Sequence, residues 1–225
     1  MYLRVLLINK IIKMSGILDL LNSDLGRQII NGVSSHTGAP ENKTADVLSS
    51  AIPLLLSAMQ RNTSSTKGAE GLLTALDSSG HDGSILENLG SFFDGGVDTD
   101  SLQDGEGILG HVLGSKQSTV QNALSQKAGL DSGTIAQILK IAAPIIMSYL
   151  GKQKRSRKIN SSNDINDLLG NLMGSQPKHE QNLITAILDA DGDGSVIDDV
   201  ADMFLGGKNK KSDLGGMLGG LFENK

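Results

Sequence analysis

The sequence repeats itself, and this repeat constrains the fold more than any other feature. After a shift of 91 residues, Gly-Ile-Leu at residues 16–18 meets Gly-Ile-Leu at residues 107–109, and the apolar stretch ending at Pro53 meets the one ending at Pro144. A sequence that recurs at a fixed period indicates a repeated supersecondary unit. We therefore expect a tandem duplication of one small module.

The offset between the two copies changes once, which indicates an insertion in the second copy. Residues 72–76 align with residues 183–187 only after a shift of 111, so the second copy carries about 20 extra residues. The extra stretch includes the basic run 152–158 and a segment rich in Ser and Asn, a composition typical of an exposed linker. We expect a linker insertion at about residues 151–170, with residues 153–167 exposed and readily cut by protease.

The spacing of apolar residues indicates helices. In segments such as residues 25–33, apolar side chains recur every three or four residues rather than every second residue, which favours an all-α fold. Residues 142–150 are apolar on nearly every side, which is typical of the central helix of a bundle. Pro53 and Pro144 fall at the same point of a long apolar helix, where a kink or a helix restart is expected because proline lacks an amide hydrogen.

These alignments predict two helical-bundle modules, each with about four or five short helices. We expect them at residues 14–104 and 105–207, packed together through the helices that contain the two prolines. Residues 1–13 form an N-terminal extension, and residues 208–225 form a tail rich in Gly and Leu. The extension is cationic and partly apolar but lacks a small-residue cleavage site, so it is a poor export signal. A cytoplasmic location is therefore expected, and export stays open as the alternative.

The composition argues against several kinds of function. The formal net charge of −5 makes nucleic acid a poor partner, because phosphate contacts need a basic surface. The absence of cysteine excludes disulfides, thiol catalysis and cysteine metal sites. No apolar run approaches the ~20 residues of a membrane span, so an integral membrane segment is not expected.

An acidic loop in the second copy has the spacing of a calcium-binding loop. Asp189, Asp191 and Asp193 occupy the first, third and fifth positions of an EF-hand-like loop. Gly194 follows where the chain must turn, and Ser195 where a backbone carbonyl is needed. The spacing therefore predicts a Ca²⁺ site in the second copy.

The end of this loop departs from the EF-hand pattern. The twelfth position, which normally carries a bidentate Glu, is Val200, and acids stand just before it as Asp198 and Asp199. Either of these two would supply the closing carboxylate, and we expect weak affinity. The alternative interpretation is a capping box, because Ser195 is followed three residues later by an acid, as Ser84 is in the first copy.

Other candidate sites are weaker. The basic run 152–158 fits a patch for nucleic acid or anionic lipid, but cations of a solvated linker after a buried helix explain it better. The four histidines are far apart in the sequence and have no short ligand spacing. No phosphate-binding loop, nucleophile elbow or catalytic carboxylate pair stands out. We therefore rank the hypothesis of an enzyme below that of a binding protein.

Three segments and the Gly/Leu tail carry a family resemblance: Gly-Ile-Leu-Asp-Leu-Leu at residues 16–21, Ile-Pro-Leu-Leu-Leu at 52–56 and His-Asp-Gly-Ser-Ile-Leu at 81–86. With the tail, they resemble a bacterial family known only as domain of unknown function 937. The resemblance implies a helical bacterial protein and no activity, substrate or catalytic residue.

Two main hypotheses of function remain, with an enzyme of unknown class as the third. The first is a non-enzymatic structural or interaction protein whose second module is stabilised by calcium. The second is a metal-free helical module that binds a protein partner or associates with itself. Calcium titration distinguishes the two.

Overall fold

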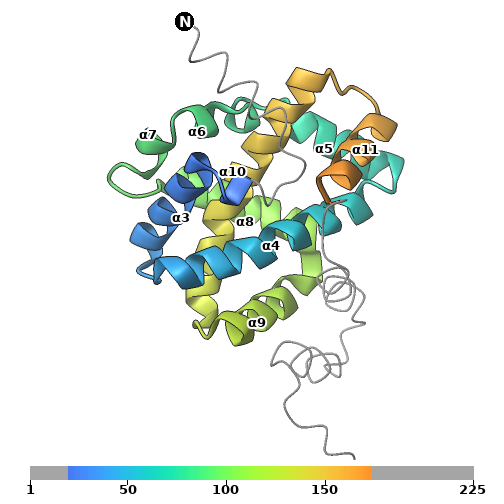
Figure 1. Cartoon of the computed structure of the whole chain (residues 1–225). Coiled ribbons are helices and arrows are strands. Elements are labelled where there is room, and N and C mark those ends of the chain that lie inside the picture. The colour runs from blue at the N-terminus through green and yellow to red at the C-terminus, as the bar shows by residue number, and fades with distance from the viewer. Residues whose placement is uncertain (1–19, 174–225) are drawn as a thin grey trace, which may run out of the picture.

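The computed structural model describes residues 20–173, which form an all-helical fold (Figure 1). Helices make up 83% of these residues, and none of them lies in a strand, so the expected all-α class is confirmed. In chain order the elements are α3 (Asp24–Thr37), α4 (Glu41–Asn62), α5 (Thr66–Ala75), η1 (Ser79–His81), α6 (Ser84–Glu87), α7 (Leu89–Phe93), α8 (Thr99–Leu113), η2 (Gly114–Lys116), α9 (Gln117–Ala128), α10 (Ser132–Arg157) and α11 (Ser162–Met173).

The fold is organised around α10, which runs through the middle of the molecule (Figure 1). Residues 141–150 are all buried, as their apolar pattern predicted. By length and composition alone α10 could cross a membrane, but 72% of its most apolar window is buried inside the fold, and the core helix of a bundle passes the same test. Both α4 and α10 continue through Pro53 and Pro144, so the helix restart considered for these positions does not occur.

The two halves of the described chain share one core. Helix α3 packs on α4, the helix that follows it, and also on α10. In the same way, α9 packs on α10, the helix that follows it, and also on α4. The expected module boundary after residue 104 falls inside α8 rather than between helices. The halves are therefore interlocked, and their long helices α4 and α10 have 22 and 26 residues instead of being short.

Matching hydrogen bonds close α3 and α9 at their C-terminal ends. Gly38, with φ of +71°, donates its amide hydrogen to the Ser34 carbonyl at 2.9 Å, and the Ser34 hydroxyl donates to the Ala39 carbonyl at 2.6 Å. The left-handed conformation at such a cap favours glycine. Helix α9 ends with bonds of the same kind and length, with φ of +59° at its glycine, made by Ser125, Gly129 and Leu130.

Helix α8 crosses α10 in close contact at Gly105. Pro144 offers no amide hydrogen to the Lys140 carbonyl one turn earlier, and a Cβ atom on Gly105 would lie 1.9 Å from that carbonyl oxygen. The next residue, Glu106, pairs with Lys140 Nζ at 2.8 Å. The pKa of the Glu106 carboxyl is lowered by the Lys140 hydrogen bond and then by one from Gln117. This crossing fixes the position of α8 on the central helix.

Helices occupy most of residues 151–170, where a linker was expected. Helix α10 continues to Arg157, and α11 packs on α4 and α5. Within the stretch expected to be exposed, Gln153 and Lys154 are 8% and 7% exposed, whereas residues 155–158 are exposed as expected. Polar residues outnumber apolar ones in this stretch, but the apolar residues recur at helical spacing, which suffices to bury one face of α11. The side chains of this stripe are 0–3% exposed: Ile165, Leu168, Leu169 and Leu172.

Candidate functional site

The His-Asp-Gly-Ser sequence at residues 81–84 forms the turn from η1 into α6, and this turn lies against α10. Glycines in the turn and in α10 allow the two to approach each other closely. A Cβ atom on Gly151 of α10 would lie 1.9 Å from the His81 carbonyl oxygen, and one on Gly83 would lie 3.1 Å from the Lys152 Cβ. Gly83 also has φ of +97°, a conformation that favours glycine. The turn therefore holds His81 in a buried position beside the central helix.

Both ring nitrogens of His81 have partners, and the residue is 7% exposed. Nδ1 lies 2.9 Å from the carbonyl oxygen of Ala75 and 2.9 Å from the hydroxyl oxygen of Ser78. Nε2 lies 2.9 Å from a carboxylate oxygen of Asp104 on α8. The imidazole thus connects the C-terminal end of α5 with α8.

Ser78, His81 and Asp104 are the residue types of a hydrolase triad, but their geometry does not suit nucleophilic catalysis. In a triad, the nitrogen that faces the serine accepts the serine proton. Here this nitrogen, Nδ1, also faces the Ala75 carbonyl oxygen, which can only accept a hydrogen bond. Nδ1 is therefore placed to donate to Ala75, and a nitrogen that donates there has no lone pair left to accept the serine proton. With its side chain 9% exposed, His81 also offers a substrate little access. The geometry fits a connection between helices.

Acidic side chains face the start of the basic run at the end of α10. Lys154, whose side chain is 9% exposed, forms an ion pair with Asp77, and Lys152 Nζ lies 3.2 Å from a carboxylate oxygen of Glu87. Lys154, Arg155 and Arg157 lie in the last turn of α10, where positive charge is favourable. These pairs favour the interpretation of the basic run as cations at a helix end over its interpretation as a patch that binds nucleic acid.

The capping box expected at Ser84 is wrong. Helix α6 begins at Ser84, with Gly83 as its N-cap and no side-chain hydrogen bond from the cap. The left-handed turn at Gly83 instead brings the Asp82 carboxylate to the Ser84 amide, which donates to it at 2.9 Å. Hydrogen bonds from the Ser84 hydroxyl and amide lower the pKa of Asp82, with a smaller effect from the charge of Arg155.

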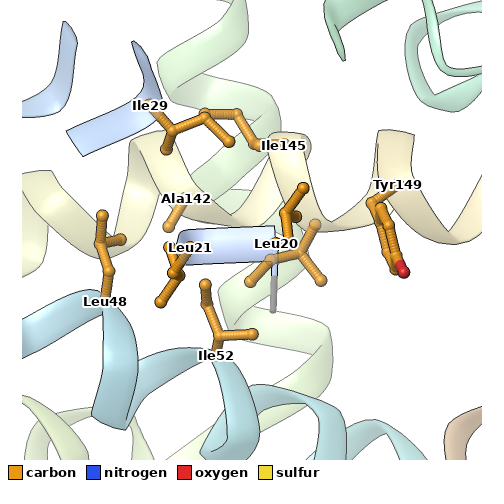
Figure 2. Close-up of a pocket in the computed structure, with 9 residues that line it drawn as sticks. Leu20, Leu21, Ile29, Leu48, Ile52, Ala142, Ile145 and Tyr149 are labelled. Atoms are coloured by element: carbon orange, nitrogen blue, oxygen red, sulfur yellow. The ribbon is translucent and has the colours of Figure 1, made fainter. Parts of the chain in front are cut away.

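A small apolar pocket lies in the core between α3, α4 and α10. Figure 2 shows the Leu20–Leu21 segment between α4 and α10, with Leu48 and Ile52 of α4 beside it. The remaining lining comes from α3 and α10 and includes Ile145. Its side chains are aliphatic apart from one tyrosine, and the cavity is only about 10 Å³, so it is a small gap in the core that offers no set of charged groups for chemistry.

The expected calcium ligands lie outside the described residues: Asp189, Asp191, Asp193, Ser195, Asp198 and Asp199. Their site therefore remains a prediction. Between residues 20 and 173, no group of three or more His, Asp and Glu side chains could hold a metal ion. His36 and His111 have their own partners, since His36 Nδ1 accepts from the Val97 amide at 3.1 Å and His111 Nδ1 lies 2.8 Å from the Gly107 carbonyl oxygen.

Sequence reasoning missed the buried connection through His81. Asp104 is 23 residues away along the chain, and only the packing of α8 beside η1 brings the two together. The available signal was the His-Asp-Gly-Ser motif, which contributed only to the family resemblance and was not identified as the place where a histidine enters the core.

Comparison with known proteins identifies a family and no function. A family model described as "Bacterial protein of unknown function (DUF937)" matches residues 19–153 and 166–225. No curated protein and no solved structure matches the chain.

Proposed function

We propose that this chain, which belongs to the bacterial family of unknown function DUF937, is a non-enzymatic helical protein that binds a protein partner or a second copy of itself. The observation that carries the proposal is the environment of His81. Its Nδ1 lies as close to the Ala75 carbonyl oxygen as to the Ser78 hydroxyl, and the side chain is buried, so the residues that most resemble a catalytic triad fit a structural role better. The paired cations of α10 and the net charge of −5 favour a protein partner over nucleic acid.

A serine-directed probe tests the non-enzymatic part of this proposal. We expect a fluorophosphonate, which labels serines activated by a general base, to leave the folded full-length chain unmodified. The Ser78→Ala variant should unfold at nearly the same urea concentration as the parent chain, because His81 keeps its Ala75 and Asp104 partners. Stoichiometric labelling that disappears in the Ser78→Ala variant would establish a nucleophilic serine and overturn the proposal.

Within this proposal, the chain is a tandem duplication whose two copies are interlocked. The matched caps support it, because Ser34 and Gly38 are separated from Ser125 and Gly129 by the same 91 residues as the two prolines. The exchanged packing of α3 and α9 on α4 and α10 has the pattern of a twofold relation between the copies. A structure-based superposition of residues 24–62 on residues 115–153 should align both caps and both prolines, and a failure to align them would remove this support.

We further propose that the acidic loop beginning at Asp189 binds Ca²⁺ and stabilises the second copy. The support is the spacing of Asp189, Asp191 and Asp193 ahead of Gly194, with Asp198 or Asp199 as the closing ligand. Affinity should be weak, about 10⁻⁴ to 10⁻³ M, as in extracellular calcium modules. Occupancy would then require export from the cytoplasm.

Thermal melts of the full chain with calcium, magnesium and a chelator test this site. Calcium at about 100 times its dissociation constant should add about 2.7 kcal/mol to stability, and the Asp191→Ala variant should lose this gain while melting normally in chelator. The matched control is Asp94→Ala, an exposed acid outside the loop, which should keep the calcium response. Identical melting temperatures in calcium and chelator would reject the site and favour the metal-free binding module.

A further inference from the structure

Three histidines lie within residues 20–173, and His36 is the one among them whose hydrogen bond requires a neutral ring. A backbone amide can only donate, so the Val97 amide, 3.1 Å from His36 Nδ1, needs a lone pair on that nitrogen. Nδ1 of His111 instead faces the Gly107 carbonyl oxygen, and both ring nitrogens of His81 face oxygen atoms that can accept. Protonation is therefore compatible with the contacts of His81 and His111 but breaks the bond between His36 and Val97.

This bond joins the loop after α7 to the last turn of α3. Val97 is 7% exposed, and His36 is the partner of its amide. Gly96, with φ of +96°, lies against the ring, since a Cβ atom there would be 3.5 Å from His36 Nδ1. One turn earlier on α3, a Cβ atom on Gly32 would overlap the ring of Phe93. The face of α3 that carries Gly32 and His36 therefore holds both the end of α7 and the loop that follows it.

The surroundings of His36 leave its ring open to protonation. His36 is half-buried, and none of the ion pairs within residues 20–173 includes it. Helices α4, α7 and α10 pack on α3; α7 has no charged residue, and the three lysines of α10 pair with acids of other elements. The other charged residues close to His36 or Val97 in the chain are Glu41, Lys43, Asp46, Asp94, Asp98 and Asp100. Lys43 donates to the Gly129 carbonyl and Asp98 accepts from the Ser101 amide.

We propose that His36 is a pH-sensitive latch that holds residues 94–98 on α3 while its ring is neutral and releases them when Nδ1 is protonated. Protonation replaces the accepting lone pair with a hydrogen that faces the Val97 amide, so two donors then oppose each other. The C-terminal end of α3 favours a positive charge, so the charged ring is stable there and loses only its bond to the loop. Release of the loop also frees Phe93 to leave Gly32, which uncovers this face of α3.

The direction of the effect follows from the bond. Histidine is the side chain whose charge ordinarily changes between about pH 5 and pH 8. Because the docked loop needs the neutral ring, docking is complete at the upper end of this range and is lost as the pH falls. The latch depends neither on the proposed function nor on the proposed duplication.

Hydrogen exchange of the Val97 amide in the full chain tests the latch, because its protection reports the opening of this bond. The protection factor compares the measured exchange rate with that of an unfolded peptide at the same pH. It should fall roughly tenfold between about pH 7.5 and about pH 5, while the amides of α4 and α10 keep theirs. Equal Val97 protection at the two pH values would overturn the proposal and would indicate that acids such as Asp94 retain the charged ring. A parallel loss across α4 and α10 would show general acid unfolding and would overturn it as well.

Three variants assign the effect to His36. The His36→Asn variant keeps an acceptor oxygen at the δ position but does not titrate, so Val97 should stay protected at both pH values. The His36→Leu variant has no acceptor, so Val97 should be weakly protected at both, with α4 and α10 unaffected. The matched control is His111→Asn, which should keep the pH dependence of the parent chain. A pH dependence that survives in His36→Asn, or one that disappears in His111→Asn, would contradict the latch. The measurement on the parent chain needs no substitution, so it decides even where a variant fails to fold.

Discussion

The crossing of α8 and α10 at Gly105 gives a sharp prediction about stability. A Cβ atom on Gly105 would lie 1.9 Å from the carbonyl oxygen of Lys140 and 2.8 Å from its carbonyl carbon. Both are backbone atoms of the buried central helix, so they cannot move aside as a flexible side chain would. Ordinary contact requires about 3.5 Å, so α8 would have to move away from α10 by more than about 1 Å.

The Gly105→Ala substitution should therefore destabilise the fold strongly. Overpacking in a rigid core costs about 1–3 kcal/mol and occasionally more, and the displacement would also strain the Glu106 contact with Lys140. We expect a loss of about 3 kcal/mol in the free energy of unfolding, at the upper end of this range. Gly107 lies in the same helix with nothing within 4 Å of its would-be Cβ, and Gly107→Ala should stabilise by about 0.5–1 kcal/mol.

Urea denaturation followed by far-ultraviolet circular dichroism would measure both variants. The midpoint should fall for Gly105→Ala and rise for Gly107→Ala, with unchanged slopes, so that the shifts report stability alone. Equal midpoints for Gly105→Ala and the parent chain would refute the close crossing. A loss of stability in both variants would show that helix α8 itself, and not its contact with α10, is sensitive to substitution.

Three further substitutions test other parts of the packing. Gly151→Ala should lower stability by about 2 kcal/mol, because its Cβ would lie 1.9 Å from the His81 carbonyl oxygen; an unchanged urea midpoint would refute the contact. Ser148→Ala should raise the melting temperature by the equivalent of about 1 kcal/mol, since the Ser148 hydroxyl is buried without a hydrogen-bond partner, and a lower melting temperature would reveal a partner. The pKa of the Glu106 carboxyl is lowered in the folded state from 4.5. Its contribution to the stability of the fold is therefore fully present above the unfolded-state pKa and is lost as the pH falls through the folded-state pKa. Glu106→Gln should therefore lose less stability than the parent chain between neutral pH and about pH 3, and equal losses would contradict the Lys140 pairing.

The sequence predicted the helical class and the central helix because both depend on local spacing. Residues 142–150 are apolar on nearly every side, and only the middle of a bundle can bury such a helix from all directions. The glycine caps at Gly38 and Gly129 were not predicted, although they too depend on local chemistry, since a left-handed residue at a helix end favours glycine.

The sequence did not predict features that depend on contacts between distant segments. Composition suggested a linker where α11 packs, because the Ser, Asn and Asp side chains of α11 outnumber the four apolar side chains that decide burial. The Ser84 capping box failed because Gly83 turns the chain and brings Asp82 to the helix end. The connection of His81 to Asp104 requires the placement of α8, which no spacing within the turn determines.

The central claim is that α4 and α10 belong to one cooperative body and not to two independent modules. Native-state hydrogen exchange across residues 20–173 tests this most directly, because it resolves the opening free energy of each helix. The interlocked packing predicts that the slowest amides of α4 and α10 open with the same free energy, equal to that of global unfolding. A lower opening free energy for all of α9, α10 and α11, with α3 and α4 still protected, would contradict the account and show two separately stable modules.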